Sequence, residues 1–169
     1  MIKFQRRNIE TERLLLAPYN IKQYKEVFHL IHKNKPRLIH SFPNLLRATE
    51  TIENTKDYVQ QKIFDWNNNR AYGFMIFDKY SHQLIGHFNL KDIDWKTRQC
   101  ELAYFIDEDD EGKGLTTEAL NALLQRCFLE IGFDRVFARI VTTNISSQKV
   151  VEKAGLKMSD ISFWELNEA

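Results

Sequence analysis

A short segment that starts at position 111, Glu-Gly-Lys-Gly-Leu-Thr-Thr-Glu-Ala, has the residue types that hold a phosphate group. Gly112 and Gly114 allow positive φ angles and close backbone approach, so successive N–H groups can form a concave nest for an anion. A helix N-terminus after them adds unpaired N–H donors and about half a positive charge. Lys113 adds a cation, and Thr116 or Thr117 adds a hydroxyl group. The segment indicates either a pyrophosphate cradle or a glycine turn that only caps a helix.

Two common phosphate-binding loops do not fit this segment. A P-loop requires a glycine, four residues and then Gly-Lys-Ser/Thr, but Gly112-Lys113 is followed by Gly114 and position 107 is an aspartate. The dinucleotide pattern G-x-G-x-x-G fails because Thr117 stands where the third glycine belongs. The segment therefore belongs to another kind of anion site.

Length and composition describe an ordinary globular domain. The chain has 169 residues, 43% of them hydrophobic and 28% charged, which predicts one domain over residues 1–169. Its 24 basic and 23 acidic residues give a net charge of +1, so no overall field attracts nucleic acid or a membrane. Two cysteines, and a basic N-terminus with no apolar run behind it, favour a cytoplasmic protein without a membrane span.

Hydrophobic periodicity predicts which elements position the glycine segment. Alternating or continuous apolar runs predict strands, and apolar residues at helical spacing predict helices. The expected order is strand 13–18, helix 21–31, helix 52–66, strands 71–77, 83–93 and 98–106, helix 120–131, strand 135–141, helix 144–154, and one or two short strands within 156–166. A strand, a helix and a second strand in succession imply a locally parallel pair, with the glycine segment between the first strand and the helix.

Four pieces of the sequence, taken together, resemble the GNAT acetyltransferase superfamily. They are Tyr-Phe-Ile-Asp from position 104, the glycine segment from 111, Asn-Ile-Ser-Ser from 144 and Val-Glu-Lys-Ala-Gly-Leu from 151. Glu-Arg-Leu-Leu-Leu from position 12 is similar to the RimJ/RimL branch, which includes the ribosomal-protein N-terminal alanine acetyltransferases. The resemblance implies an α/β fold of three layers. Its mixed, mostly antiparallel sheet would have about six to seven strands, flanked by four helices.

The resemblance also implies acetyl-CoA as the cofactor and assigns residues to it. Phe105 and Ile106 would lie along the pantetheine arm, where two parallel strands separate. The pyrophosphate would lie on the backbone amides of Gly112, Lys113, Gly114, Leu115, Thr116 and Thr117. Asn144 and Ser147 match an Asn-x-x-Ser pattern near the thioester.

Several positions depart from the family pattern. The residue three positions before the first glycine is Asp109, where relatives often have Gln or Arg, and residues 107–111 are all acidic. We expect this acidic run to point into solvent, with Lys113, Lys149 and Lys153 offsetting its charge. Val151 stands where many relatives have a tyrosine general acid. Only 14 residues follow Gly155, so we expect the last strand to be short or missing.

Acetyl transfer to an amine requires a base and a proton donor, and the sequence offers few candidates for either role. The amine must lose its proton, and Glu101 is the candidate base because it lies on the strand before the glycine segment; the alternative is a structural glutamate. Ser147 is the candidate proton donor, or else a residue of the first helical turn, and Asn144 could be only a helix cap. Tyr104 and Cys127 fit the core. The histidines have no metal-ligand spacing, so no metal is expected.

These observations predict an acetyl-CoA-dependent N-acetyltransferase that acts on a primary amine. The acceptor would be a protein N-terminus or a small amine, and the acetyl group would move by direct attack on the thioester. A non-catalytic acyl-CoA-binding module and an interaction protein that kept only the scaffold are the alternatives. A homodimer is possible on these residues, and the acceptor carries no sequence signature.

Overall fold

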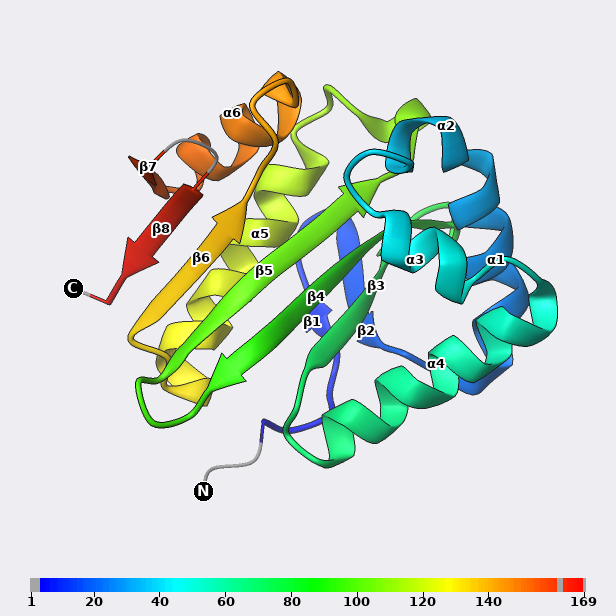
Figure 1. Cartoon of the computed structure of the whole chain (residues 1–169), viewed down its shortest axis with the longest axis horizontal. Helices are drawn as coiled ribbons and strands as arrows, with labels where there is room; N and C mark the ends of the chain where they lie inside the picture. The colour runs from blue at the N-terminus through cyan, green and yellow to red at the C-terminus, as the bar shows by residue number, and fades with distance from the viewer. Residues whose placement is uncertain (1–3, 161–162, 169) are drawn as a thin grey trace.

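The computed structural model describes residues 4–160 and 163–168, and it contains one mixed sheet with helices on both faces (Figure 1). In the described chain the sheet has eight strands in the order β1-β2-β3-β4-β5-β6-β8-β7. They are β1 (Ile9–Glu10), β2 (Leu14–Pro18), β3 (Tyr72–Asp78), β4 (Leu84–Asp94), β5 (Gln99–Ile106), β6 (Arg135–Arg139), β7 (Lys157–Asp160) and β8 (Phe163–Asn167). All neighbours are antiparallel except β5 and β6, which are parallel as expected.

Six α-helices connect the strands of this described part. They are α1 (Tyr24–Lys33), α2 (Lys35–Leu38), α3 (Pro43–Ala48), α4 (Ile52–Asn67), α5 (Leu115–Arg126) and α6 (Ile145–Lys153). Thr51 caps α4 by accepting a hydrogen bond from the backbone N–H of Asn54, and Asn144 caps α6 in the same way. A π-helical turn, Cys127–Ile131, extends α5 as far as Gly132, whose φ of 82° ends it.

Two hydrophobic clusters hold the layers together, one on each face of the sheet. On one face, α5 packs through Leu120 and Leu123 against strand residues such as Phe74 and Phe88, all of them fully buried. On the other face, α1 and α4 cover Met75 and Phe77 with a second cluster. Figure 1 shows α5 behind the sheet and α1, α3 and α4 toward one end of its near side. The expected three-layer α/β architecture is therefore confirmed.

The strands β5 and β6 separate after a short paired stretch, which is the feature that matters for the site. They pair only from Gln99–Arg135 to Glu101–Phe137, although β5 continues to Ile106 and β6 to Arg139. Beyond Glu101, β5 pairs with β4 alone, so its other edge has no strand partner. The sheet thus opens into a V whose mouth lies at the N-terminus of α5 (Figure 1).

The structure differs from the sequence expectations at three places. The sheet has additional strand pairing at β1, so the described chain has eight strands instead of six or seven. The connection around Pro36 and Pro43 folds into α2 and α3, each with a proline in its first turn, which gives six helices instead of four. The last strand is not missing: β8 pairs with β6 along its whole length, while residues 161–162 of the expected 156–166 segment lie outside the described part. Among the described residues, no helix is long and apolar enough to cross a membrane.

Candidate active site

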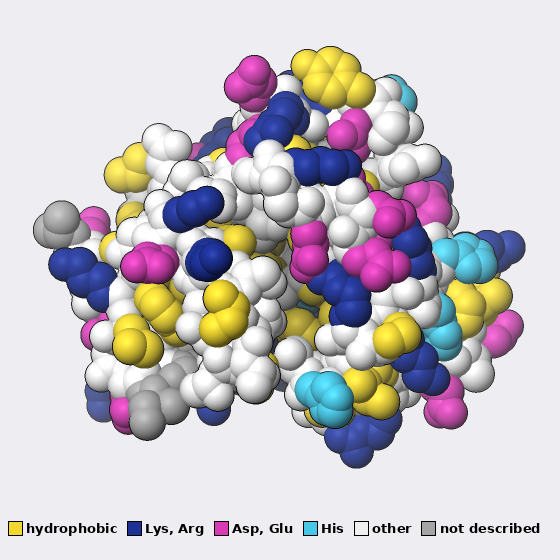
Figure 2. All heavy atoms as spheres, turned by 90° about the horizontal axis from the view of Figure 1, so that it is seen from above, with side chains coloured by type: hydrophobic (Ala, Val, Ile, Leu, Met, Phe, Trp, Pro, Cys, Tyr) yellow, Lys and Arg dark blue, Asp and Glu magenta, His cyan; other side chains and the backbone are white. Residues whose placement is uncertain are grey.

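A groove of about 260 Å³ runs from the C-terminal end of β5 to the glycine segment. The C-terminal end of β5, the N-terminus of α5, the N-terminus of α6 and the α2–α3 connection supply its walls. Seen from above in Figure 2, the molecule is hollowed between the α6 side and the α2–α3 side, with charged side chains gathered along the rim. Of the expected cofactor residues, those lining the groove are Phe105, Ile106, Gly112, Gly114, Leu115, Thr116, Thr117 and Asn144.

The glycine segment presents a row of unpaired backbone donors to this groove. Gly112 and Gly114 have φ angles of 75° and 76°, and α5 begins directly after them. Within the part of the chain that the structure describes, none of the backbone N–H groups from Gly112 to Thr117 donates to a protein acceptor. Six consecutive free amides at a helix N-terminus form the nest that a phosphate group fits. The residues present therefore fit a pyrophosphate.

Lys113 does not line the groove. Its ammonium pairs with Asp110 at 3.2 Å, and its carbonyl oxygen accepts a hydrogen bond from Arg13. Lys149 and Lys153 of α6 line the groove together with Asp110 and Glu111. Among the described residues neither lysine forms an ion pair with the acidic run, so their role in offsetting its charge stays a prediction.

Cations from α1 and α2 compensate the acidic run. Lys33 contacts Asp107 at 2.8 Å and Asp109 at 2.6 Å, and these bonds lower the pKa of Asp109. Arg37 forms an ion pair with Glu111 and donates to the carbonyl oxygen of Ile106 at 3.1 Å. The acidic run is thus a set of ion pairs that attaches the α1–α2 region to the groove. No sequence motif marks these cations, because each pair joins residues about 70 positions apart.

Glu118 fastens the first turn of α5 to the β1–β2 connection. Its carboxylate accepts hydrogen bonds from the Thr11 hydroxyl at 2.6 Å and from the Arg13 backbone N–H at 2.8 Å, and it pairs with the Arg13 guanidinium at 2.7 Å. Burial raises the pKa of Glu118, but these hydrogen bonds outweigh burial and the net pKa is lowered. Glu118 therefore acts as a structural anchor for the amide nest.

We expect Glu118→Gln to lower the free energy of unfolding by about 2 kcal/mol at neutral pH, because charge-assisted hydrogen bonds are lost. Since folding lowers the pKa of Glu118, its stabilisation is fully present above the ordinary value of 4.5 and disappears as the pH falls through the folded value. Urea unfolding of both proteins at pH 7 and pH 3 measures this, with exposed Glu152→Gln as the control. If the free energy of unfolding differed between wild type and Glu118→Gln by the same amount at both pH values, the role of Glu118 as a charged anchor would be contradicted.

A second cavity of about 120 Å³ lies in the V, lined by residues of both β5 and β6. Both cavities share a wall, which consists of Ser41, Phe42, Tyr104, Asn144 and Ser147. The Tyr104 hydroxyl donates to the carbonyl oxygen of Ser147 at 3.0 Å and so bridges the separated elements, and burial raises its pKa. Asn144 is the cap of α6, accepting from the N–H of Ser147 at 3.2 Å, and it also lines both cavities. A molecule lying in the groove would thus meet a second molecule entering from the opposite side.

Glu101 lies in the second cavity and is bound by an arginine. Its two carboxylate oxygens accept hydrogen bonds from Arg139, at 3.2 Å from Nε and 2.8 Å from the terminal nitrogen. Glu101 is buried, whereas Arg139 is largely exposed, and the bond raises the pKa of Arg139. Sequence reasoning selected Glu101 but gave no indication of Arg139. In this geometry the arginine fixes the orientation of the carboxylate.

Neither a reactive thiol nor a metal centre is evident in the described residues. Cys100 and Cys127 are free and have no exposed surface, and burial raises the pKa of both thiols. No group of three or more His, Cys, Asp or Glu residues in the described chain could hold a metal ion. Cys100 points to the α5 side of the sheet and Glu101 to the other, as neighbours on a strand do.

Comparison with known proteins agrees with this arrangement. Residues 13–157 match the family described as acetyltransferase (GNAT) domain. The chain is 29% identical over 122 residues to the probable N-acetyltransferase YjcK of Bacillus subtilis, covering 70% of this chain and 67% of that protein. It is 32% identical over 100 residues to the ribosomal-protein-serine acetyltransferase of Escherichia coli, covering 59% of this chain and 54% of the relative.

A solved structure shares the fold. RimL, described as a ribosomal L7/L12 alpha-N-protein acetyltransferase in complex with coenzyme A, superposes with a TM-score of 0.84 at 18% identity, over 95% of this chain and 98% of that one. The match to the family model extends over most of the chain, from β2 to the start of β7, and includes the V between β5 and β6 and the amide nest. The chain therefore belongs to the GNAT acetyltransferase family.

Proposed function

We propose that the protein transfers the acetyl group of acetyl-CoA to a primary amine, and that this amine is the N-terminus of a protein. The observation that carries this proposal is the V between β5 and β6, with the amide nest at one end and a separate cavity beyond the shared wall. A cofactor with a pyrophosphate and a long flexible arm fits the first cavity, and a nucleophile fits the second.

The unpaired edge of β5 supports a role in holding the arm of the cofactor. From Leu102 to Phe105, backbone groups on this edge have no strand partner, so they are available to the amides of a pantetheine chain, whereas the carbonyl oxygen of Ile106 already accepts from Arg37. Acetyl-CoA, when bound, supplies an acetyl thioester that a neutral amine can attack. In that reaction a C–N bond forms, the C–S bond breaks, the nitrogen loses a proton, and the sulfur takes up a proton and leaves as the free thiol of CoA.

Two residues of the second cavity, Glu101 and Ser147, are proposed to handle the protons, and Ser147 is also part of the shared wall. Glu101, oriented by Arg139, would accept the proton that the acceptor ammonium loses, directly or through water. Ser147 would donate a proton to the leaving sulfur, because it lines both cavities. A backbone N–H on the open edge of β5 would stabilise the charge that develops on the carbonyl oxygen.

Direct transfer is favoured over a covalent enzyme intermediate. An acyl-enzyme would require a nucleophile such as a thiolate, and thiolates form where a thiol is accessible and its pKa is low. Both thiols here are fully buried, and burial raises their pKa. The acetyl group would therefore pass from the cofactor to the amine in one step.

The acceptor class is supported by relatives and by amine chemistry. The Escherichia coli relative is named a ribosomal-protein-serine acetyltransferase, and RimL an alpha-N-protein acetyltransferase. A free α-amine has a pKa near 8, about two units below that of a lysine side chain, so more of it is neutral at physiological pH. An N-terminal amine thus requires less help from a base.

The proposal is tested by incubating the protein with acetyl-CoA and a panel of N-terminal peptides and small amines, and by measuring release of free CoA thiol. We expect release that depends on the acceptor, with the acetyl group found on the peptide α-amine by mass spectrometry. Reactions without an acceptor measure background hydrolysis. Saturable acetyl-CoA binding without turnover of any acceptor would mean a non-catalytic binding module, and absence of binding would mean that only the scaffold is kept.

A further inference from the structure

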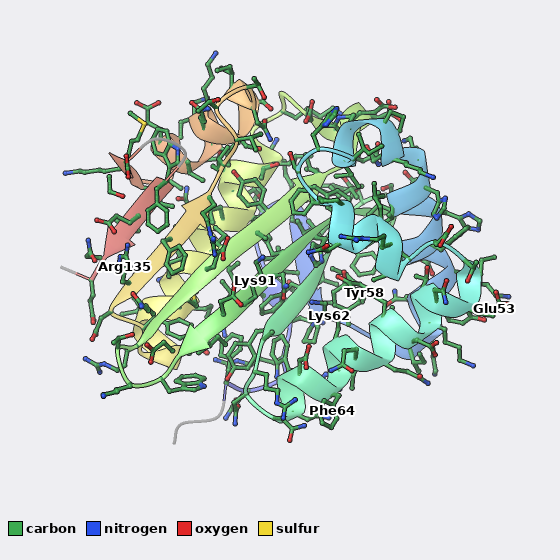
Figure 3. All side chains as sticks on the ribbon, in the orientation of Figure 1. Glu53, Tyr58, Lys62, Phe64, Lys91 and Arg135 are labelled. Carbon is green, nitrogen blue, oxygen red and sulfur yellow. The ribbon has the colours of Figure 1, made fainter. Side chains whose placement is uncertain are left out.

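Two lysines, Lys62 and Lys91, stand over the face of the sheet that carries the second cavity, and we refer to them as the lysine pair. Lys62 comes from α4 and Lys91 from β4, and Figure 3 shows both over the near face of the sheet. Among the described residues neither lysine forms an ion pair. A partly buried ammonium without an ion-pair partner is unusual, because buried charges are normally paired.

Lys62 is held above the sheet by its surroundings. A Cβ atom at Gly73 would lie 3.3 Å from the Cδ of Lys62, so the lysine stem lies directly over this glycine. Its ammonium lies 5.2 Å from the centre of the Tyr58 ring. Burial lowers the pKa of Lys62, Asp65 opposes this change, and the positive charge of Lys91 adds to it. The two lysines are thus close enough to repel each other.

Lys91 lines the second cavity directly opposite Glu101 in the β4–β5 ladder. Among the described residues no hydrogen bond joins Lys91 to that carboxylate, whose two oxygens accept from Arg139. The ion pair Glu101–Arg139 has no net charge. Lys91 therefore adds positive charge to the second cavity, where the acceptor would enter.

Asn89 lies on the same face of β4 as Lys91 and has an unsatisfied acceptor. Its partners on the neighbouring strands are small: Gly73 on β3 and Ala103 on β5. Asn89 is 7% exposed, and its Oδ1 has no hydrogen-bond donor among the described residues. A buried polar atom without a partner points to a donor that the chain itself does not supply.

The other charged groups near this face act on cations other than Lys91. Asp65 acts on Lys62, where it opposes the effect of burial, and its carboxylate also accepts a hydrogen bond from Gln61 at 2.8 Å; Asp92 acts on Arg139. His87 carries no charge at neutral pH, because burial and the charge of Lys62 lower its pKa to about 3. Lys91 therefore remains without an ion-pair partner among the described residues.

We propose that the lysine pair selects an acceptor N-terminus that carries an acidic side chain at its second or third residue. This inference rests on the proposed function and names the substrate class of the same site. Residues directly opposite in an antiparallel ladder have Cβ atoms about 5 Å apart, and an extended peptide advances about 3.4 Å per residue. An amine at Glu101 therefore places the side chain of the next one or two residues at Lys91, which lines the same cavity.

The same charges also assist the reaction. A positive potential disfavours an ammonium ion and thereby lowers the pKa of the bound amine. The acidic side chain of the acceptor peptide is attracted by the lysine pair, and this attraction compensates for the repulsion between the lysine pair and the N-terminal ammonium group of the same peptide. The lysine pair thus favours the neutral amine, and it favours acceptors that bring their own negative charge.

The test compares peptides of equal length that carry Asp or Glu at positions two and three with peptides that carry Asn or Gln there. We expect kcat/KM to be about tenfold higher for the acidic peptides, as two partly exposed ion pairs would give, and to fall as salt is added. Lys91→Gln should remove most of this preference and Lys62→Gln part of it. Lys96→Gln, an exposed lysine in the turn after β4, should leave it unchanged.

The outcomes separate this inference from the proposed function. Equal turnover of acidic and neutral peptides would overturn the inference and leave the function standing. If no peptide is turned over, binding of the same peptides to the protein in the presence of CoA, measured by calorimetry, decides the matter. If the acidic peptide then binds more tightly than the neutral one, and Lys91→Gln removes this difference, the preference for acidic peptides is supported although the proposed function fails. Equal binding of the two peptides, or no binding, would overturn the inference.

Discussion

Gly112→Ala is expected to weaken acetyl-CoA binding about 100-fold, which corresponds to the loss of one or two hydrogen bonds to a charged phosphate. Gly112 has a φ of 75°, and the position of its Cβ is open space at the groove. An alanine there adds backbone strain and places a methyl group where the pyrophosphate would approach. Calorimetric titration with acetyl-CoA measures the effect.

Gly132 offers a matched control for this substitution. Its φ is 82°, its Cβ position is likewise free of neighbours within 4 Å, and it lies at the opposite end of the same helical segment. Gly132→Ala therefore introduces a similar strain, about 1–2 kcal/mol, without reaching the groove. If both variants lost affinity equally, the effect would come from the stability of α5, and the amide nest would not be the phosphate site.

Glu101→Gln is expected to reduce kcat about 100-fold while leaving the affinity for acetyl-CoA unchanged, because a positioned base contributes roughly 10²–10⁴-fold. Glutamine keeps the size of the side chain but cannot accept a proton from the amine. Release of CoA thiol at saturating peptide measures kcat, and calorimetry measures cofactor affinity.

The chain provides a control for loss of an ion pair on the same face of the sheet. Glu165 on β8 pairs with Arg135 at 2.5 Å but lines neither cavity. Glu165→Gln should therefore change stability and leave kcat unaltered. A Glu101→Gln enzyme with the kcat of wild type would assign Glu101 a purely structural role, and the lower pKa of an α-amine would then suffice for attack.

Local patterns were enough to predict most of the elements that carry the site. The apolar stripe of α5, its end at Gly132 and the cap Asn144 are short-range signals, and all three are confirmed. The parallel β5–β6 pair followed from the order of strand, helix and strand. These features depend on residues that are close together in the chain.

Contacts between distant segments could not be predicted in this way. Arg37 meets Glu111, and Thr11 meets Glu118, only because the folded sheet brings these segments together. Lys62 lies over Gly73 because a helix crosses a strand there, which no periodicity reveals. The acceptor side depends on such contacts, and for this reason its chemistry emerged only from the three-dimensional structure.

The open edge of β5 has a consequence for self-association. Unpaired strand edges are templates for aggregation, and proteins normally protect the outermost ones. Here the unpaired edge lies between two strands of one sheet, and the Tyr104–Ser147 hydrogen bond spans the gap, so a strand of another molecule has no access. At the outer edges, β1 has only two residues, and β7 has only four and carries Lys157 and Asp160 at its ends, which discourages pairing. The fold therefore keeps backbone groups available for a ligand inside the sheet, while its outer edges are short strands.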